Sequence, residues 1–113
     1  MLTVTPEERT VAKAAELLHA LASPTRLAIF TILTRREVPV GALATAVGLS
    51  QSALSQHLAK LRRDDLVTTR RDAQTIYYSC NSTAVKGLLD VLASLDDVAN
   101  DDIEPVLLKT PLR

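Results

Sequence analysis

Residues 47–67 read VGLSQSALSQHLAKLRRDDLV, and this stretch decides the fold. A short apolar run with helical spacing, Val40 to Val47, leads into it and stops at Gly48. Two residues later, Ser50 is suited to cap a second helix, which we expect to end near Arg63. Two helices joined by a short glycine-containing turn predict a helix-turn-helix.

The periodicity of the sequence changes directly after this second helix. Leu66 to Arg71 and Thr75 to Cys80 are rich in Val, Thr, Ile and Tyr, which are typical of strands. The residues between them, Asp-Ala-Gln at 72–74, predict a hairpin connection. A hairpin that follows a helix-turn-helix at once is expected to form a wing.

Three further helices are predicted around this centre. Thr5 followed by Pro6 indicates the start of a first helix, Ser23 followed by Pro24 starts a second, and Ser82 caps the last. The segment 35–39 is expected to be a break. The predicted fold class is therefore mainly α with a small β-hairpin wing, a winged helix-turn-helix in the order helix-helix-helix-helix-strand-strand-helix.

The length of 113 residues suits one compact domain, which we place at residues 1–95, followed by an acidic, loosely ordered tail at 96–113. The net charge is zero, but the charges are unevenly distributed. Up to Thr75 the chain has ten basic and seven acidic residues, whereas after Thr75 it has three basic and six acidic residues. A local basic stripe between Lys60 and Arg71 can attract a polyanion, although charge alone also fits a solvated face.

The helix from Ser50 to Arg63 has an unusual outward side. Its apolar residues gather on one side, and the opposite side carries short hydroxyls, an amide and then bases, with no acid before Asp64. This pattern fits a DNA major groove, where small and amide side chains read base edges and cations reach phosphates. We predict base reading by Gln51, Ser52, Ser55 and Gln56, and phosphate contacts by Lys60, Arg62 and Arg63.

The hairpin tip is the second candidate DNA contact. Arg70, Arg71 and Gln74 are placed there, and a wing commonly lies along the backbone or in the minor groove, where Arg is favoured. The alternative is a solvated turn. His57 falls on the inward side of its helix and is expected to be a boundary residue rather than a base reader, and Cys80 is expected to be a small buried hydrophobe.

Three stretches carry a family resemblance: SPTRLAIFTIL at 23–33, VGLSQSALSQHLAKLRRDDLV at 47–67 and TTRRDAQTIYYS at 68–79. Together they resemble the ArsR/SmtB family of bacterial winged-helix regulators, over roughly residues 17–95. The resemblance implies a homodimer built from the first and last helices, with two recognition helices about one DNA turn apart. The apolar stripes on those two helices fit such an interface: Val11, Ala14, Ala15, Leu18, Leu88, Leu89, Leu92 and Leu95.

Many members of this family sense metals, and the chain departs from them. Pro39 and Gly41 stand where the resemblance implies paired cysteine ligands, and no histidine follows His57 for a site on the last helix. With Cys80 as the single cysteine, no thiolate-rich site forms within one subunit. We therefore expect neither a metal site nor a cofactor. The usual glycine of the wing is replaced by Ala73.

The leading functional hypothesis is a sequence-specific repressor that binds a palindromic double-stranded operator as a homodimer. A winged helix that contacts proteins instead, with the acidic tail as a docking segment, is the alternative. An enzyme is not expected, since no phosphate loop, metal cluster or acid pair is visible. No leader or membrane-spanning stretch is evident, so the expected location is the cytoplasm. The sequence points to no small-molecule effector.

Overall fold

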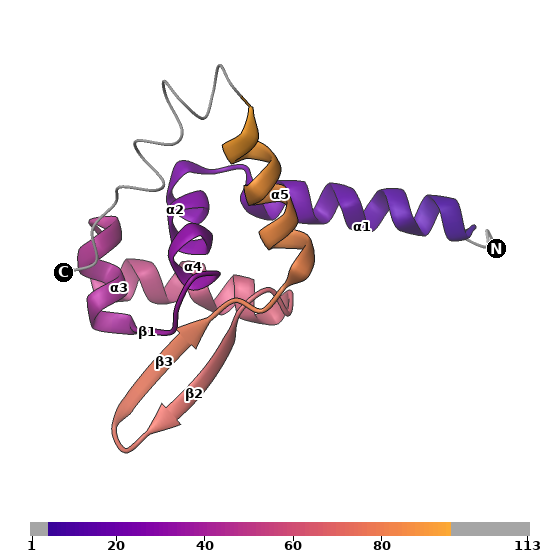
Figure 1. Cartoon of the computed structure of the whole chain (residues 1–113). Coiled ribbons are helices and arrows are strands. Elements are labelled where there is room, and N and C mark those ends of the chain that lie inside the picture. Colours follow the sequence, from indigo (N-terminus) through magenta and orange to yellow (C-terminus); the bar gives the residue numbers. More distant parts are fainter. Residues whose placement is uncertain (1–4, 96–113) are drawn as a thin grey trace.

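The computed structural model describes residues 5–95 and contains the helices and strands that the sequence predicts, together with one extra short strand (Figure 1). The predicted acidic tail lies outside the described residues. The elements in chain order are α1 (Pro6–Leu21), α2 (Pro24–Leu33), β1 (Val38–Pro39), α3 (Val40–Val47), α4 (Gln51–Arg63), β2 (Thr68–Asp72), β3 (Thr75–Ser79) and α5 (Thr83–Ser94).

Side-chain caps fix where the helices begin. Thr5 and Glu8 form a capping box at α1, in which the Glu8 N–H donates to Thr5 Oγ1 and the Thr5 N–H donates to Glu8 Oε2, both at 3.1 Å. Ser23 and Ser82 accept from backbone N–H groups at the starts of α2 and α5. The predicted helix starts are confirmed at all three places.

Gly48 ends α3 and sets the helix-turn-helix. Its φ of 73° is left-handed, a conformation that glycine adopts without a Cβ penalty. The Leu49 N–H then donates to the Ala44 carbonyl at 3.0 Å, as in a Schellman motif. Ser50 Oγ accepts from the Ala53 N–H at 3.1 Å and starts α4. The turn between the two helices therefore has only three residues, 48–50.

The small sheet has three antiparallel strands in the order β1-β3-β2. The segment 35–39, expected to be a break, contributes β1, where Val38 pairs with Tyr78 and Pro39 with Tyr77. The hairpin connection is shorter than predicted, because Asp72 already pairs with Thr75. Only two residues, Ala73 and Gln74, form the turn. The strand β1 ties the base of the wing to the helical body.

One apolar core joins α2, α3, α4 and the start of α5. Its largest fully buried side chains are Ile29, Phe30, Leu33, Leu43, Leu54, Leu58, Leu61 and Val85. Helix α1 enters this core only at its C-terminal end, through Ala20 and Leu21, and the rest of it projects from the body (Figure 1). None of the helices described over residues 5–95 combines the length and apolarity that a bilayer span requires.

Candidate nucleic-acid interface

Helix α4 is held by three leucines and turns its remaining faces outward. Leu54, Leu58 and Leu61 are all at most 1% exposed, and they recur at the spacing of one helix face. Burying three leucines fixes the rotation of α4 about its axis, with each one contributing about 1.5–3 kcal/mol. The opposite face is thereby presented as a rigid surface.

The predicted base-reading residues share the exposed N-terminal half of α4. Ser52, Ser55 and Gln56 are all exposed, and Ser52 Oγ lies 3.3 Å from Ser50 Oγ. Gln51 is exposed too, but its side-chain nitrogen lies 3.3 Å from the position that a Cβ on Gly41 would occupy. The Gln51 side chain therefore lies against α3.

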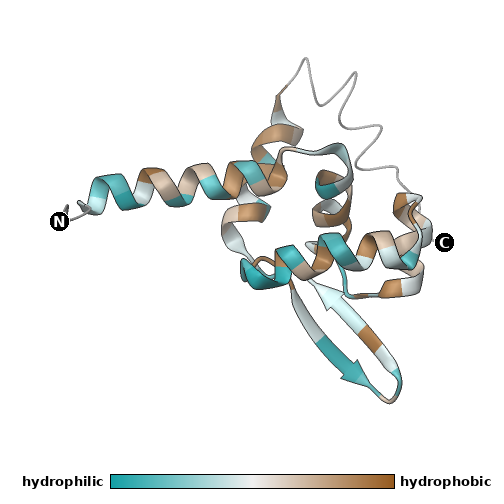
Figure 2. Ribbon diagram, turned by 180° about the vertical axis from the view of Figure 1, so that it is seen from behind, coloured by the Kyte–Doolittle hydropathy of each residue, from teal (hydrophilic) through white to brown (hydrophobic). Residues whose placement is uncertain are grey.

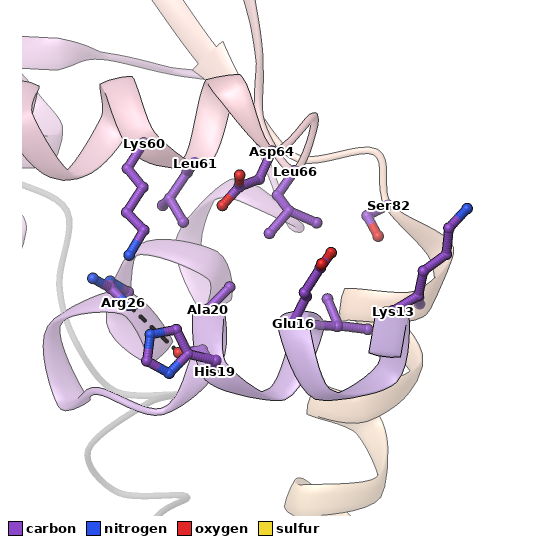
Figure 3. A pocket seen from close by; sticks show the side chains of 12 residues that line it. Lys13, Glu16, His19, Ala20, Arg26, Lys60, Leu61, Asp64, Leu66 and Ser82 are labelled. Atoms are coloured by element: carbon purple, nitrogen blue, oxygen red, sulfur yellow. Dashed lines mark hydrogen bonds between the residues drawn. The ribbon is translucent and has the colours of Figure 1, made fainter. Parts of the chain in front are cut away.

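The three predicted phosphate contacts at the end of α4 do not share one environment. Arg62 and Arg63 are exposed, whereas Lys60 is half-buried. Figure 3 shows the Lys60 side chain reaching from α4 toward Arg26 of α2, inside a pocket. Arg62 and Arg63 are exposed and accessible to a phosphate backbone, whereas the half-buried Lys60 side chain also lines the pocket. Its dual position depends on α1 and α2, which the sequence of α4 alone does not reveal.

Arg70 does not lie at the hairpin tip, and this corrects the prediction. It sits within β2 opposite Tyr77, and its guanidinium forms a bidentate contact with Glu37, with Nη2–Oε1 at 2.7 Å and Nε–Oε2 at 3.0 Å. The same guanidinium lies 4.6 Å from the centre of the Tyr77 ring. The hydrogen bond from Arg70 lowers the pKa of Glu37, and in return that bond raises the pKa of Arg70.

The other two wing residues remain available. Arg71 and Gln74 are exposed, Arg71 in β2 and Gln74 in the turn itself. Ala73, which precedes Gln74, has a φ of 56°. A positive φ at the first turn residue only is the pattern of a type II′ hairpin, which favours glycine at that place. The wing keeps this conformation although the glycine is missing.

The apolar residues predicted for a dimer interface divide into two groups. On α1, Val11 is 68% and Leu18 57% exposed, and Ala14 and Ala15 are exposed as well. On α5, Leu88 and Leu89 are partly buried against the core of their own chain, Leu92 is half-buried, and Leu95 is 45% exposed. Val91, 56% exposed, joins the outward side of α5. Its spacing of four from Leu95 could have identified it.

Within the described part of the chain, the metal-ligating and nucleophilic side chains do not come together in one site. Cys80 is buried, and this burial raises the pKa of its thiol. His57 is half-buried, as its position on the helix predicts. Within residues 5–95, no three His, Cys, Asp or Glu side chains come together in a way that could hold a metal ion. The interface is therefore built from hydroxyls, amides and cations.

A helix-turn-helix with a polar, acid-free recognition face and a following wing defines a winged-helix DNA-binding protein. The comparisons agree with this class. A helix-turn-helix domain family matches residues 21–70. The nodulation protein NolR of Rhizobium meliloti is 53% identical over 114 residues, covering all of this chain and 91% of NolR. The transcriptional activator HlyU of Vibrio cholerae is 50% identical over 93 residues, 82% of this chain and 86% of HlyU.

Solved structures give the same answer. The crystal structure of NolR from Sinorhizobium fredii is 52% identical and matches with a TM-score of 0.74, over 88% of this chain and 98% of that one. Among the sequence relatives, a transcriptional repressor SmtB homolog of Synechocystis is 42% identical over 74 residues, which cover 66% of this chain and 56% of the homolog. The chain belongs to the ArsR/SmtB family of winged-helix transcriptional regulators. This is a family of DNA-binding regulators and not of enzymes.

Proposed function

We propose that the protein is a cytoplasmic repressor that binds a palindromic operator as a homodimer and carries no metal sensor site. The observation that carries the proposal is the outward face of α4, where Ser52, Ser55 and Gln56 stand exposed beside a helix N-terminus. Gln can bond the N6 and N7 edge of adenine, and short hydroxyls let the helix approach the bases closely. Arg62 and Arg63 follow on the same helix for phosphates.

The exposed stripe on α1 supports the homodimer. Val11 and Leu18 are more than half exposed on a helix that projects from the body, and such a stripe is costly to leave in water. A second copy of the same chain offers the same stripe, as a two-fold interface requires. Figure 2 shows further brown, hydrophobic segments on α5, at the end of the molecule where α1 joins the body. A two-fold dimer would present two α4 helices to successive turns of DNA.

The proposed lack of a metal site rests on residue types. Family-type sites need several thiolates or imidazoles, whereas the sequence offers only His19 on α1, His57 on α4 and Cys80 in the segment between β3 and α5. Pro39 stands in β1, at the place that the family resemblance implies for a cysteine ligand, and Gly41 stands in α3 at the other. We therefore propose that DNA binding by this protein does not depend on a metal ion.

Selection from random duplex DNA tests the proposal. The protein is incubated with the pool at near-physiological salt, and bound duplexes are sequenced. We expect a palindrome with half-site centres about 10 base pairs apart to be enriched. Gln56→Ala should relax the preference at one position in each half-site, whereas Thr45→Ala, on an exposed residue of α3, serves as the matched control. If no sequence is enriched and binding stays at roughly 10⁻⁴–10⁻⁶ M, the proposal is wrong and a protein partner becomes the better reading.

A further inference from the structure

A pocket of about 580 Å³ lies beneath α4, where α1, α2 and the start of α5 meet (Figure 3). We call it the basic pocket, because Arg26 of α2, Lys60 of α4 and His19 of α1 lie together at one end of it. Its apolar lining includes Leu17, Ala20 and Leu61. The volume is in the range of sites that hold small organic molecules.

The cations at this end form no ion pair within residues 5–95. Arg26 and Lys60 are both half-buried, and within residues 5–95 no carboxylate lies within salt-bridge distance of either. The guanidinium of Arg26 has one weak hydrogen bond, from Nη1 to the His19 carbonyl at 3.4 Å. Converging cations that lose part of their hydration without an anion are destabilising. A bound anion would relieve both the repulsion and the desolvation.

We infer that the basic pocket binds a small monocarboxylic acid with an apolar body. The carboxylate would meet Arg26 and Lys60, since guanidinium and ammonium groups bind carboxylates by charge-assisted hydrogen bonds. The body would lie on Leu17 and Leu66, the two leucines of the lining that are partly exposed. Glu16 and Asp64 also line the pocket, beyond the cationic end (Figure 3). Their negative charges disfavour a ligand with a second carboxylate at its other end.

The pocket is also placed to regulate, an inference that rests on the proposed function. Ala20 lines the pocket from α1 and lies about half a turn around the helix from Val11 and Leu18 of the exposed stripe, and Leu17 lines the same pocket at about 100–120° from them. The stripe that we assign to the partner chain is therefore on the far side of α1 from the ligand. An occupant would sit between α1 and α4, so it would alter how the two recognition helices of a dimer are spaced, and with them operator affinity.

Calorimetry on the full chain without DNA tests the pocket itself. Hexanoate is the probe, acetate removes the apolar body, adipate adds a second carboxylate and hexylamine reverses the charge. We expect saturable binding of hexanoate, at least tenfold weaker binding of acetate and adipate, and none of hexylamine. The double variant Arg26→Gln/Lys60→Gln should weaken hexanoate binding at least tenfold, and Lys60→Gln alone, on a half-exposed side chain, should do so in part.

The matched control is Arg9→Gln/Lys86→Gln, which removes two exposed cations outside the pocket and should leave hexanoate binding unchanged. The inference is wrong if hexanoate does not saturate by roughly 10 mM, weaker than any useful affinity, if hexylamine binds as well as hexanoate, or if the control variant loses as much affinity as Lys60→Gln.

A second arm tests regulation, using the duplex enriched by selection. Saturating hexanoate should change operator affinity at least threefold, and the operator should change hexanoate affinity by the same factor. Binding without this reciprocal change would overturn the regulatory role. If the protein selects no DNA at all, the proposed function fails, while calorimetry still decides whether the pocket binds the acid.

Discussion

Arg70 of the wing is bound to Glu37, which lies 33 positions earlier in the chain, just before β1. Both oxygens of the carboxylate accept from the guanidinium, and the Tyr77 ring lies beneath the same group. The contact joins the hairpin to the loop that follows α2. Arg70 is thereby a positioning residue for the wing in the free protein, and Arg71 is the exposed wing cation that forms no ion pair within residues 5–95.

Releasing Arg70 should make DNA binding more salt-dependent. In Glu37→Gln the guanidinium loses its charged partner and becomes free to reach a phosphate, which steepens the slope of log K against log salt by about 0.9 per protomer. Fluorescence anisotropy of a labelled duplex over a range of salt concentrations measures this slope. Glu7→Gln, which makes the same charge change on the exposed first turn of α1, is the control. A slope equal to that of the wild type would contradict the prediction.

The same contact predicts that the Glu37–Arg70 pair loses its contribution to stability at low pH. The hydrogen bond from Arg70 holds the pKa of Glu37 below its ordinary value of 4.5, so the folded state binds this proton less readily than the unfolded chain. The pair's contribution is therefore complete above pH 4.5 and is lost as the pH falls through the lowered value. Carbon-detected NMR titration of the Glu37 carboxyl should give a midpoint below 4.5. In Arg70→Gln the midpoint should return to the ordinary value, and an unchanged midpoint would refute the pairing.

The turn of the wing should gain stability from glycine. Ala73 has a φ of 56°, and left-handed backbone costs an L-residue about 1–2 kcal/mol. Ala73→Gly removes this strain at some cost in chain entropy, so we expect unfolding to require up to about 1 kcal/mol more. Gly48→Ala makes the opposite change, because it places a Cβ on a residue with a φ of 73°, and no neighbouring atom obstructs that Cβ. It should destabilise by about 1 kcal/mol. Urea denaturation of both variants checks the two signs.

Charges on the α1 stripe should separate the dimer without unfolding the chain. Val11 and Leu18 are 68% and 57% exposed in the single chain, so Val11→Lys/Leu18→Lys removes little packing within it. Across a two-fold interface the same lysines would face one another and repel. Analytical ultracentrifugation should show a monomer, with an unchanged circular dichroism spectrum. Arg9→Ala, on the other side of α1, should remain dimeric. A double variant that stays dimeric would exclude this stripe as the interface.

Local patterns predicted the fold because local chemistry determines it. Gly48 ends α3 in a left-handed conformation, and the Ser50 side chain caps the start of α4. Both signals are local and can be recognised from a few consecutive residues. The recognition face followed from the spacing of Leu54, Leu58 and Leu61. The predicted order of helices and strands was therefore confirmed, apart from β1, whose two residues are too few to give a periodic pattern.

Contacts between distant segments could not be predicted in this way. Glu37 and Arg70 are both ordinary surface charges in the sequence, and only the pairing of β1 with β3 brings them together. The pattern of α4 predicts Lys60 as a phosphate contact but does not reveal that residues of α1 and α2 line the same pocket as this side chain. The choice among Gln51, Ser55 and Gln56 likewise depends on α3, against which Gln51 leans.

Whether α4 reads DNA sequence is decided by one affinity ratio. Wild-type protein and Gln56→Ala are titrated by fluorescence anisotropy against the selected palindrome and against single-base variants of it at near-physiological salt. We expect the wild type to bind the palindrome at least 10³-fold more tightly than scrambled duplex. One base substitution per half-site should cost the wild type about 1–3 kcal/mol and cost Gln56→Ala almost nothing. Equal penalties in both proteins would contradict base reading by Gln56, and equal affinity for palindrome and scrambled duplex would contradict the account as a whole.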